Sequence, residues 1–113
     1  MGDLPSSFGP VAQLLAFADV DHPLRVHVAV VVRSVIDYRT AEVVDVATET
    51  ARAREAGALV LWDLSHAVGA IDIDLHACGA ELAVGCTYKF LNAGPGAPAF
   101  SWVTRELQQQ LEQ

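Results

Sequence analysis

The chain holds a small set of reactive side chains, and each of them follows a predicted strand. A carboxylate and an imidazole lie in the segment 63–66 (DLSH), and a phenol and a primary amine lie in Tyr88 and Lys89. Lys89 is the only lysine among the 113 residues, and Ser34 follows a further predicted strand. Because ligands of open α/β sheets bind beyond the carboxyl ends of parallel strands, we expect these groups to converge at one edge of a sheet.

A lysine beside a tyrosine and opposite an aspartate matches what pyridoxal 5′-phosphate requires of a protein. The amine must form a Schiff base with the cofactor's aldehyde, and the carboxylate must keep the pyridine nitrogen protonated so that the ring can accept electrons. Opposite unit charges about 4 Å apart, at an effective dielectric of about 20, attract by about 4 kcal/mol, which is roughly three pKa units before desolvation. Asp63 could therefore keep a pyridinium charged. Arginine could not replace Lys89, because a guanidinium stays protonated.

Each of these residues also has a purely structural interpretation. Lys89 could be a solvated surface charge, Asp63 could cap the turn after its strand, and His66 could be an ordinary loop histidine. The segment 72–76 (DIDLH) could ligate a metal ion, but nothing in its spacing fixes a coordination geometry and a surface turn explains it better. The segment 92–96 (NAGPG) could bind an anion through its amides or simply form a tight loop. Spacing alone does not decide between these interpretations.

Composition excludes several classes of protein. Hydrophobic residues make up 52% of the chain and charged residues 19%, so disorder is excluded as a global description. The formal net charge of −7 has the wrong sign for a surface that binds nucleic acid. No apolar run approaches the roughly 20 residues that cross a bilayer, which predicts no membrane segment. Cys78 and Cys86 lie in apolar surroundings without CxxC spacing, which favours a reducing compartment such as the cytoplasm.

The predicted elements alternate as in an α/β fold. Residues 1–9 read as a poorly ordered leader, and a helix is predicted from about residue 10, with Val11, Leu14, Leu15 and Ala18 on one face. The apolar runs 26–32, 58–62 and 81–86 are typical of strands buried in a parallel sheet. Between the first two, a helix over 41–56 is predicted, with Thr40 as N-cap and Gly57 as its end.

The last predicted strand covers residues 97–103, and a polar helix follows over 104–113. The connection before this strand is too short for the helical crossover that parallel strands require. The strand is therefore predicted to be antiparallel to its neighbour. At this length the chain is expected to form one domain, residues 10–113.

The stretch from residue 59 to 103 (LVLWDLSHAVGAIDIDLHACGAELAVGCTYKFLNAGPGAPAFSWV) closely resembles the kynureninase family, fold-type I pyridoxal-phosphate enzymes related to the class V aminotransferases. The motifs WDLSHAVGA, GCTYKFLN and GPGAPAF carry the resemblance, and a weaker likeness extends back to SVIDYRT at 34–40. Cysteine desulfurases share the Asp-x-x-His element but usually have a histidine before the lysine, where this chain has Tyr88. The resemblance implies a mostly parallel sheet with helices on both faces, as part of a large domain.

Carried onto matching positions, the resemblance implies pyridoxal 5′-phosphate as cofactor. Lys89 would form the Schiff base, Asp63 would pair with the pyridine nitrogen, and His66 would lie beside the cofactor. Tyr88 would bond the phosphate and take part in proton transfer, and Ser34 would contact the cofactor. In this alignment Asp37 stands where many members have asparagine, and Ala41 where glycine is common.

The family resemblance further implies hydrolysis of L-kynurenine, or of 3-hydroxykynurenine, to anthranilate and L-alanine by a homodimer. From the resemblance together with the composition, we expect a cytoplasmic protein with no nucleic-acid or membrane partner and no metal. Members are several times longer than this chain, so we expect a piece of the large domain that is not active alone. Two other interpretations stay open. The chain could come from another class V enzyme, such as a cysteine desulfurase or an aminotransferase, or it could be a non-catalytic remnant that retains the fold.

Overall fold

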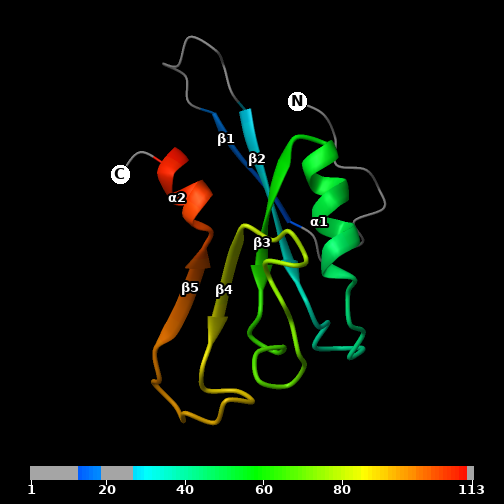
Figure 1. Ribbon diagram of the computed structural model, residues 1–113. Helices are drawn as coiled ribbons and strands as arrows, with labels where there is room; N and C mark the ends of the chain where they lie inside the picture. The colour runs from blue at the N-terminus through cyan, green and yellow to red at the C-terminus, as the bar shows by residue number, and fades with distance from the viewer. Residues whose placement is uncertain (1–12, 19–26, 112–113) are drawn as a thin grey trace.

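The computed structural model describes residues 13–18 and 27–111 and shows a twisted five-stranded sheet with two helices (Figure 1). The strands lie in chain order across the sheet. The elements are β1 (Gln13–Ala18), β2 (His27–Ser34), α1 (Val46–Glu55), β3 (Ala58–Asp63), β4 (Leu82–Cys86), β5 (Ala99–Val103) and α2 (Arg105–Gln110). Among the described residues no helix has the length and hydrophobicity needed to cross a membrane.

The central strands β2, β3 and β4 are parallel, and the strand at each side is antiparallel to its neighbour. The predicted α/β class, the three parallel strands and the antiparallel last strand are therefore confirmed, although β3 and β4 alternate between buried and half-buried residues and are not buried throughout. Strand β2, helix α1 and strand β3 form one βαβ unit, in which α1 packs against β3 (Figure 1). The three parallel strands point their carboxyl ends to the same edge of the sheet, at the bottom of Figure 1.

The core lies between α1 and one face of the sheet. Along β3, alternate residues are buried, and Trp62 has no exposed surface. The Trp62 indole N–H donates to the hydroxyl of Thr50, a buried residue of α1, at 3.0 Å. This bond satisfies two polar groups that would otherwise be buried without a partner. Helix α1 is thereby fixed above the strand that ends in Asp63.

The prediction of a helix near residue 10 is wrong where the structure describes that segment, because residues 13–18 form strand β1. β1 pairs along its whole length with β2, from Gln13 opposite Val32 to Ala18 opposite His27. Short apolar runs fit helical and extended spacing equally well, and here the unpaired edge of β2 decides for a strand. The predicted leader, residues 1–9, lies outside the described residues.

The predicted start of the long helix is also wrong. Thr40 is not the N-cap; α1 begins at Val46, and Asp45 caps it by accepting a hydrogen bond from the Thr48 amide at 3.0 Å. Residues 36–44 instead form a hairpin-like turn, in which Val44 N donates to Val35 O and Ile36 bridges to Val43. Backbone pairing with the end of β2 therefore overrides the helical pattern of residues 41–45.

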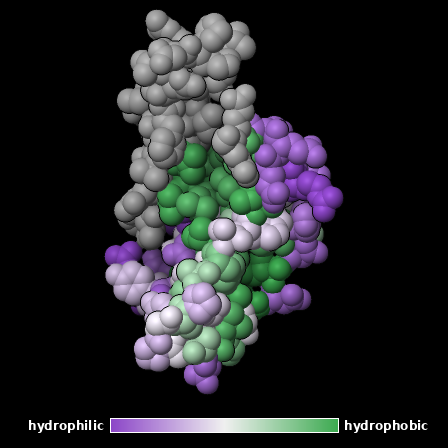
Figure 2. All heavy atoms as spheres, turned by 90° about the vertical axis from the view of Figure 1, so that its left-hand side faces the viewer, coloured by the Kyte–Doolittle hydropathy of each residue, from purple (hydrophilic) through white to green (hydrophobic). Residues whose placement is uncertain are grey.

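Several large apolar side chains are exposed to solvent in the described residues. Viewed from the β5 side, the surface shows hydrophobic residues over the middle of the molecule (Figure 2). The large hydrophobic residues that are exposed among those described are Tyr38, Val43, Tyr88, Phe90, Leu91 and Leu111. Tyr88, Phe90 and Leu91 flank or follow Lys89, so these three exposed side chains border the edge where the predicted site lies.

Candidate functional site

The predicted site residues follow the three parallel strands at their common edge. Ser34 is the last residue of β2 and Asp63 the last residue of β3, while His66 lies in the turn after β3. Tyr88 and Lys89 lie in the loop after β4. The sheet therefore brings all five residues to one edge, as the strand order predicts.

Ser34 and Asp63 form the first pair at this edge. They are opposite each other in the β2–β3 register, and the Ser34 hydroxyl donates to Asp63 Oδ2 at 3.5 Å. The amide of Ser65 donates to Asp63 Oδ1 at 2.8 Å. Both carboxylate oxygens thus accept a hydrogen bond, which restricts the rotation of the side chain.

The turn after β3 places His66. Leu64 N donates to Val84 O at 2.8 Å, and Leu64 O accepts from Ala67 N at 2.9 Å. Leu64 and Ala67 are buried in the core. With these two residues anchored inside, His66 is held half-buried at the edge.

The loop after β4 places Lys89. Its backbone forms two turns, in which Asn92 N donates to Lys89 O at 2.9 Å and Ala93 N donates to Thr87 O at 3.0 Å. The Thr87 hydroxyl also donates to Pro98 O at 2.6 Å, which ties the start of the loop to its end. The loop is therefore compact, and it holds Lys89, the only lysine of the chain, near the end of β3.

His66 and Lys89 form the second pair: Lys89 Nζ lies 3.1 Å from His66 Nε2. An ammonium group has no lone pair, so a charged Lys89 donates and the imidazole accepts on Nε2, which places the imidazole proton on Nδ1. Lys89 Nζ also lies 5.7 Å from the centroid of the Tyr88 ring. Tyr88 itself is 52% exposed.

Asp63 and Lys89 form no ion pair with each other in the part of the chain that the structure describes. The carboxylate is held by Ser34 and Ser65, and the amine is held by His66. Asp63 and Lys89 thus follow neighbouring strands, and each is oriented by other groups. This arrangement suits a ligand that lies between the carboxylate and the amine.

Tyr38 is a residue of the edge that the sequence did not single out. Its ring stacks on His66, with the centroids 6.1 Å apart and the planes at 23°. The guanidinium of Arg39 lies 5.8 Å from the centroid of the Tyr38 ring. The one available signal was the position of Tyr38 in the SVIDYRT run directly after β2.

Asp37 organises the turn that carries Tyr38. Its carboxylate accepts the Arg39 amide at 2.8 Å and a guanidinium N–H of Arg39 at 3.4 Å. These bonds to Arg39, the backbone bond first, hold the pKa of the Asp37 carboxyl below its ordinary value. The peptide of Asp37 is also paired, since Asp37 N donates to Glu42 O and Ala41 N donates to Asp37 O.

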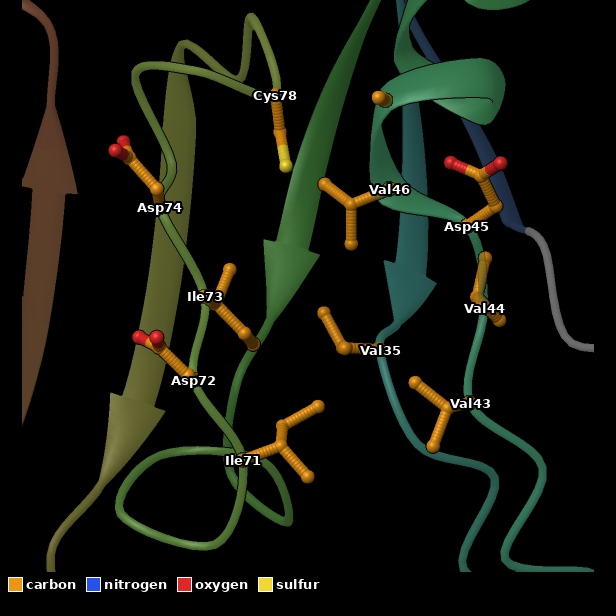
Figure 3. Close-up of a pocket in the computed structure, with 11 residues that line it drawn as sticks. Val35, Val43, Val44, Asp45, Val46, Ile71, Asp72, Ile73, Asp74 and Cys78 are labelled. Atoms are coloured by element: carbon orange, nitrogen blue, oxygen red, sulfur yellow. The ribbon is translucent and has the colours of Figure 1, made fainter.

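A pocket of about 190 Å³ lies elsewhere, between the start of α1 and the segment 71–78 (Figure 3). Apolar side chains form most of its lining, including Val35, Val46 and Ile73, which point toward one another in Figure 3. None of the five predicted site residues lines it. Two of its carboxylates already serve the backbone, because Asp45 caps α1 and Asp74 accepts Ala77 N at 2.9 Å. We therefore place the candidate site at the sheet edge.

Comparison with known proteins gives consistent results at the levels of sequence and fold. No family model matches the chain. A kynureninase of Burkholderia mallei (strain SAVP1) is 47% identical over 96 residues, which are 85% of this chain and 23% of that protein. A kynureninase of Pseudomonas fluorescens is 49% identical over 79 residues, 70% of this chain and 19% of that protein. The chain thus spans about a fifth to a quarter of the length of these relatives.

Solved structures show the same fold. Alanine–glyoxylate aminotransferase from Nostoc sp. superposes with a TM-score of 0.61 and 25% identity, over 72% of this chain and 21% of that one. A methionine gamma lyase from Micromonospora echinospora superposes with a TM-score of 0.58 and 24% identity, over 82% of this chain and 28% of that one.

The fold and its carboxyl edge define part of the large domain of a fold-type I pyridoxal-phosphate enzyme. Within this class the sequence is similar to one segment of curated kynureninases, at 47% and 49% identity, in agreement with the resemblance seen in its motifs.

The residues at the edge fit pyridoxal 5′-phosphate as cofactor. The fit rests on the kinds of group present: a primary amine for the aldehyde, a carboxylate held by two donors for the pyridine nitrogen, and an imidazole and a phenol beside them. The two arginines nearest to Ser34 in the sequence each form an ion pair with a carboxylate. Arg33 pairs with Glu49, and Arg39 pairs with Asp37.

Proposed function

We propose that this chain is the segment of a kynureninase that carries the cofactor lysine, and that the complete enzyme hydrolyses L-kynurenine to anthranilate and L-alanine. The observation that carries the proposal is the contact of the only lysine with His66, next to the strand that ends in Asp63. Identity of 47% with a kynureninase across 85% of the chain supports the choice of reaction. When bound, the cofactor supplies an electron sink for cleavage of a bond in the substrate.

Each residue of the edge has a role in this proposal. Lys89 would hold the cofactor through its aldehyde and would carry the proton of the substrate's α-carbon. Asp63, oriented by Ser34 and Ser65, accepts the hydrogen bond of the protonated pyridine nitrogen. His66 would lie beside the cofactor ring, next to Lys89. Tyr88 bonds the phosphate and donates a proton to the substrate's β-carbon.

The cofactor assignment can be tested on the chain itself. We expect a pyridoxyl adduct at Lys89 when the chain is incubated with pyridoxal 5′-phosphate and reduced with borohydride, as located by peptide mass spectrometry. Lys89→Arg should abolish the side-chain adduct, because arginine is no nucleophile at neutral pH. The chain's α-amino group, the other primary amine, serves as the internal reference. An adduct on the α-amino group alone would overturn the assignment of Lys89.

The reaction can be tested by transplantation. The matching 96 residues would replace their counterpart in the Burkholderia mallei kynureninase, and the fluorescence of anthranilate would report hydrolysis of L-kynurenine. We expect activity in the chimera and none in its Lys89→Ala version. A chimera that binds the cofactor but transaminates glyoxylate, or desulfurates cysteine, instead of hydrolysing L-kynurenine would favour another class V enzyme.

A further inference from the structure

We propose that Tyr38 is a positioning residue, which sets the orientation of the His66 imidazole and, through it, of the Lys89 amine. The observation is a continuous contact across three elements of the edge. The Tyr38 ring stacks on His66, and His66 Nε2 lies 3.1 Å from Lys89 Nζ. The inference rests on the proposed function only in taking Lys89 as the reactive amine.

The His66 ring needs an external support because only one of its nitrogens has a hydrogen-bond partner among the described residues, namely Nε2. Rotation of the ring about its side-chain bonds would carry Nε2 away from Lys89. A stacked aromatic ring resists such rotation, since tilting the imidazole would lose the parallel contact at 23°. Tyr38 thus supplies a restraint that no hydrogen bond provides.

The turn that carries Tyr38 is itself rigidly held. The Asp37 side chain accepts two hydrogen bonds from Arg39, and the backbone of Asp37 is bonded to Ala41 and Glu42. The Arg39 guanidinium lies over the Tyr38 ring at 5.8 Å. These contacts restrain the backbone on both sides of Tyr38 and give its ring a second neighbour besides His66.

Burial argues against a role of Tyr38 in the core. Its side chain is 74% exposed, and it has no place in the buried cluster. An exposed aromatic residue that contacts His66 and Arg39, while leaving the core to others, has its effect at the site rather than on the stability of the fold. Because Tyr38 is exposed, its substitution should leave the fold intact, so a change in the reactivity of Lys89 can be assigned to the site.

The test measures how fast Lys89 reacts with acetic anhydride in the cofactor-free chain, at one fixed pH, by peptide mass spectrometry. Lys89 is the only lysine, and the α-amino group gives the reference rate. The contact with His66 holds the amine in a part-buried position and limits access of the reagent to it. We expect Tyr38→Ala to speed acetylation of Lys89 about two- to tenfold, the range for loss of one hydrogen bond. Tyr38→Phe, which retains the ring, should react at the parent rate.

Two further variants separate this role from general loosening. Val43→Ala changes a residue of the same turn that is 54% exposed and should leave the rate unchanged. His66→Phe removes the acceptor and should speed acetylation as Tyr38→Ala does. Adding Tyr38→Ala to His66→Phe should then have no further effect, because the two residues act through one contact.

The inference is overturned if Tyr38→Ala reacts at the parent rate, if Tyr38→Phe behaves like Tyr38→Ala, or if the effects of Tyr38→Ala and His66→Phe add. Its failure is distinguishable from failure of the proposed function. A pyridoxyl adduct at Lys89 together with an acetylation rate that Tyr38→Ala leaves unchanged would contradict only the role of Tyr38. Non-additive effects of Tyr38→Ala and His66→Phe on acetylation, without any pyridoxyl adduct at Lys89, would contradict the cofactor assignment and support the contact.

Discussion

Ser34 and Asp63 stand opposite each other in the parallel pairing of β2 with β3, and the Ser34 hydroxyl donates to Asp63 Oδ2 at 3.5 Å. The other carboxylate oxygen is held by a backbone amide, that of Ser65. One oxygen of the carboxylate therefore depends on a side chain that can be removed, and the other depends on the fold of the turn.

Ser34→Ala should weaken the binding of pyridoxal 5′-phosphate to the chain about two- to tenfold, as expected for loss of one hydrogen bond to an orienting hydroxyl. Absorbance titration with the cofactor measures the effect. Ser65→Ala is the matched control, because Ser65 uses its amide and keeps that bond without its hydroxyl. Equal losses in the two variants would contradict a role of the Ser34 hydroxyl in holding Asp63.

Thr50→Val should lower the free energy of unfolding by about 1–3 kcal/mol, the cost of leaving a buried donor without a partner. The donor is the indole N–H of Trp62, a side chain with no exposed surface, which bonds the Thr50 hydroxyl at 3.0 Å. Urea denaturation monitored by tryptophan fluorescence measures the change. Thr50→Ser keeps the hydroxyl and should cost clearly less; a serine variant as unstable as the valine variant would mean that packing, and not the hydrogen bond, is lost.

Ala41→Gly should stabilise the chain by about 0.5–1 kcal/mol, because a left-handed backbone conformation is costly for alanine and free of steric cost for glycine. Ala41 has a φ of 59° in the turn that carries Tyr38. The control is Ala47→Gly at an exposed position of α1, where glycine should destabilise by about 1 kcal/mol. Shifts of the urea midpoint in the same direction for both variants would exclude this account.

How far the sequence predicts the structure depends on the kind of signal. Strands β2, β3 and β4 follow from buried apolar runs, and their order brings Asp63, His66 and Lys89 to one edge. The predictions for β1 and for the start of α1 are wrong because backbone pairing decides both segments. β1 pairs with β2, and Ile36 bridges to Val43 before α1 begins, and neither pairing leaves a signal in the local sequence pattern. The stacking of Tyr38 on His66 joins two turns that are far apart in the sequence, and no spacing rule reveals such a contact.

The stability of α1 should depend on pH through its N-cap. Hydrogen bonds from Thr48, first from its amide and then from its hydroxyl, lower the pKa of Asp45 below the ordinary value of 3.8. A lowered carboxyl pKa stabilises the fold above the unfolded-state value, and this contribution is lost as the pH falls through the folded-state pKa. Asp45→Asn keeps a capping oxygen that does not titrate. Between neutral pH and pH values below 3.8, the parent should therefore lose more helix stability than Asp45→Asn, as measured by circular dichroism during urea denaturation. Equal losses would show that Asp45 does not carry the acid sensitivity.

Gly85 lies opposite Phe100 in the antiparallel pairing of β4 with β5, and the Phe100 ring occupies the space that a side chain at position 85 would need. A Cβ atom at Gly85 would lie 2.8 Å from Phe100 Cε1, closer than real Cβ contacts occur. Gly85→Ala should therefore force the ring aside and lower the free energy of unfolding by about 1–3 kcal/mol, the usual cost of overpacking. The displacement should also reach the loop of Lys89, since β4 and β5 are joined by that loop, so acetylation of Lys89 should speed up. Phe100→Leu removes the clashing ring atoms, and in that background Gly85→Ala should cost clearly less. If urea denaturation instead gives the same cost for Gly85→Ala in both backgrounds, the backbone of β4 and not the Phe100 ring demands glycine there.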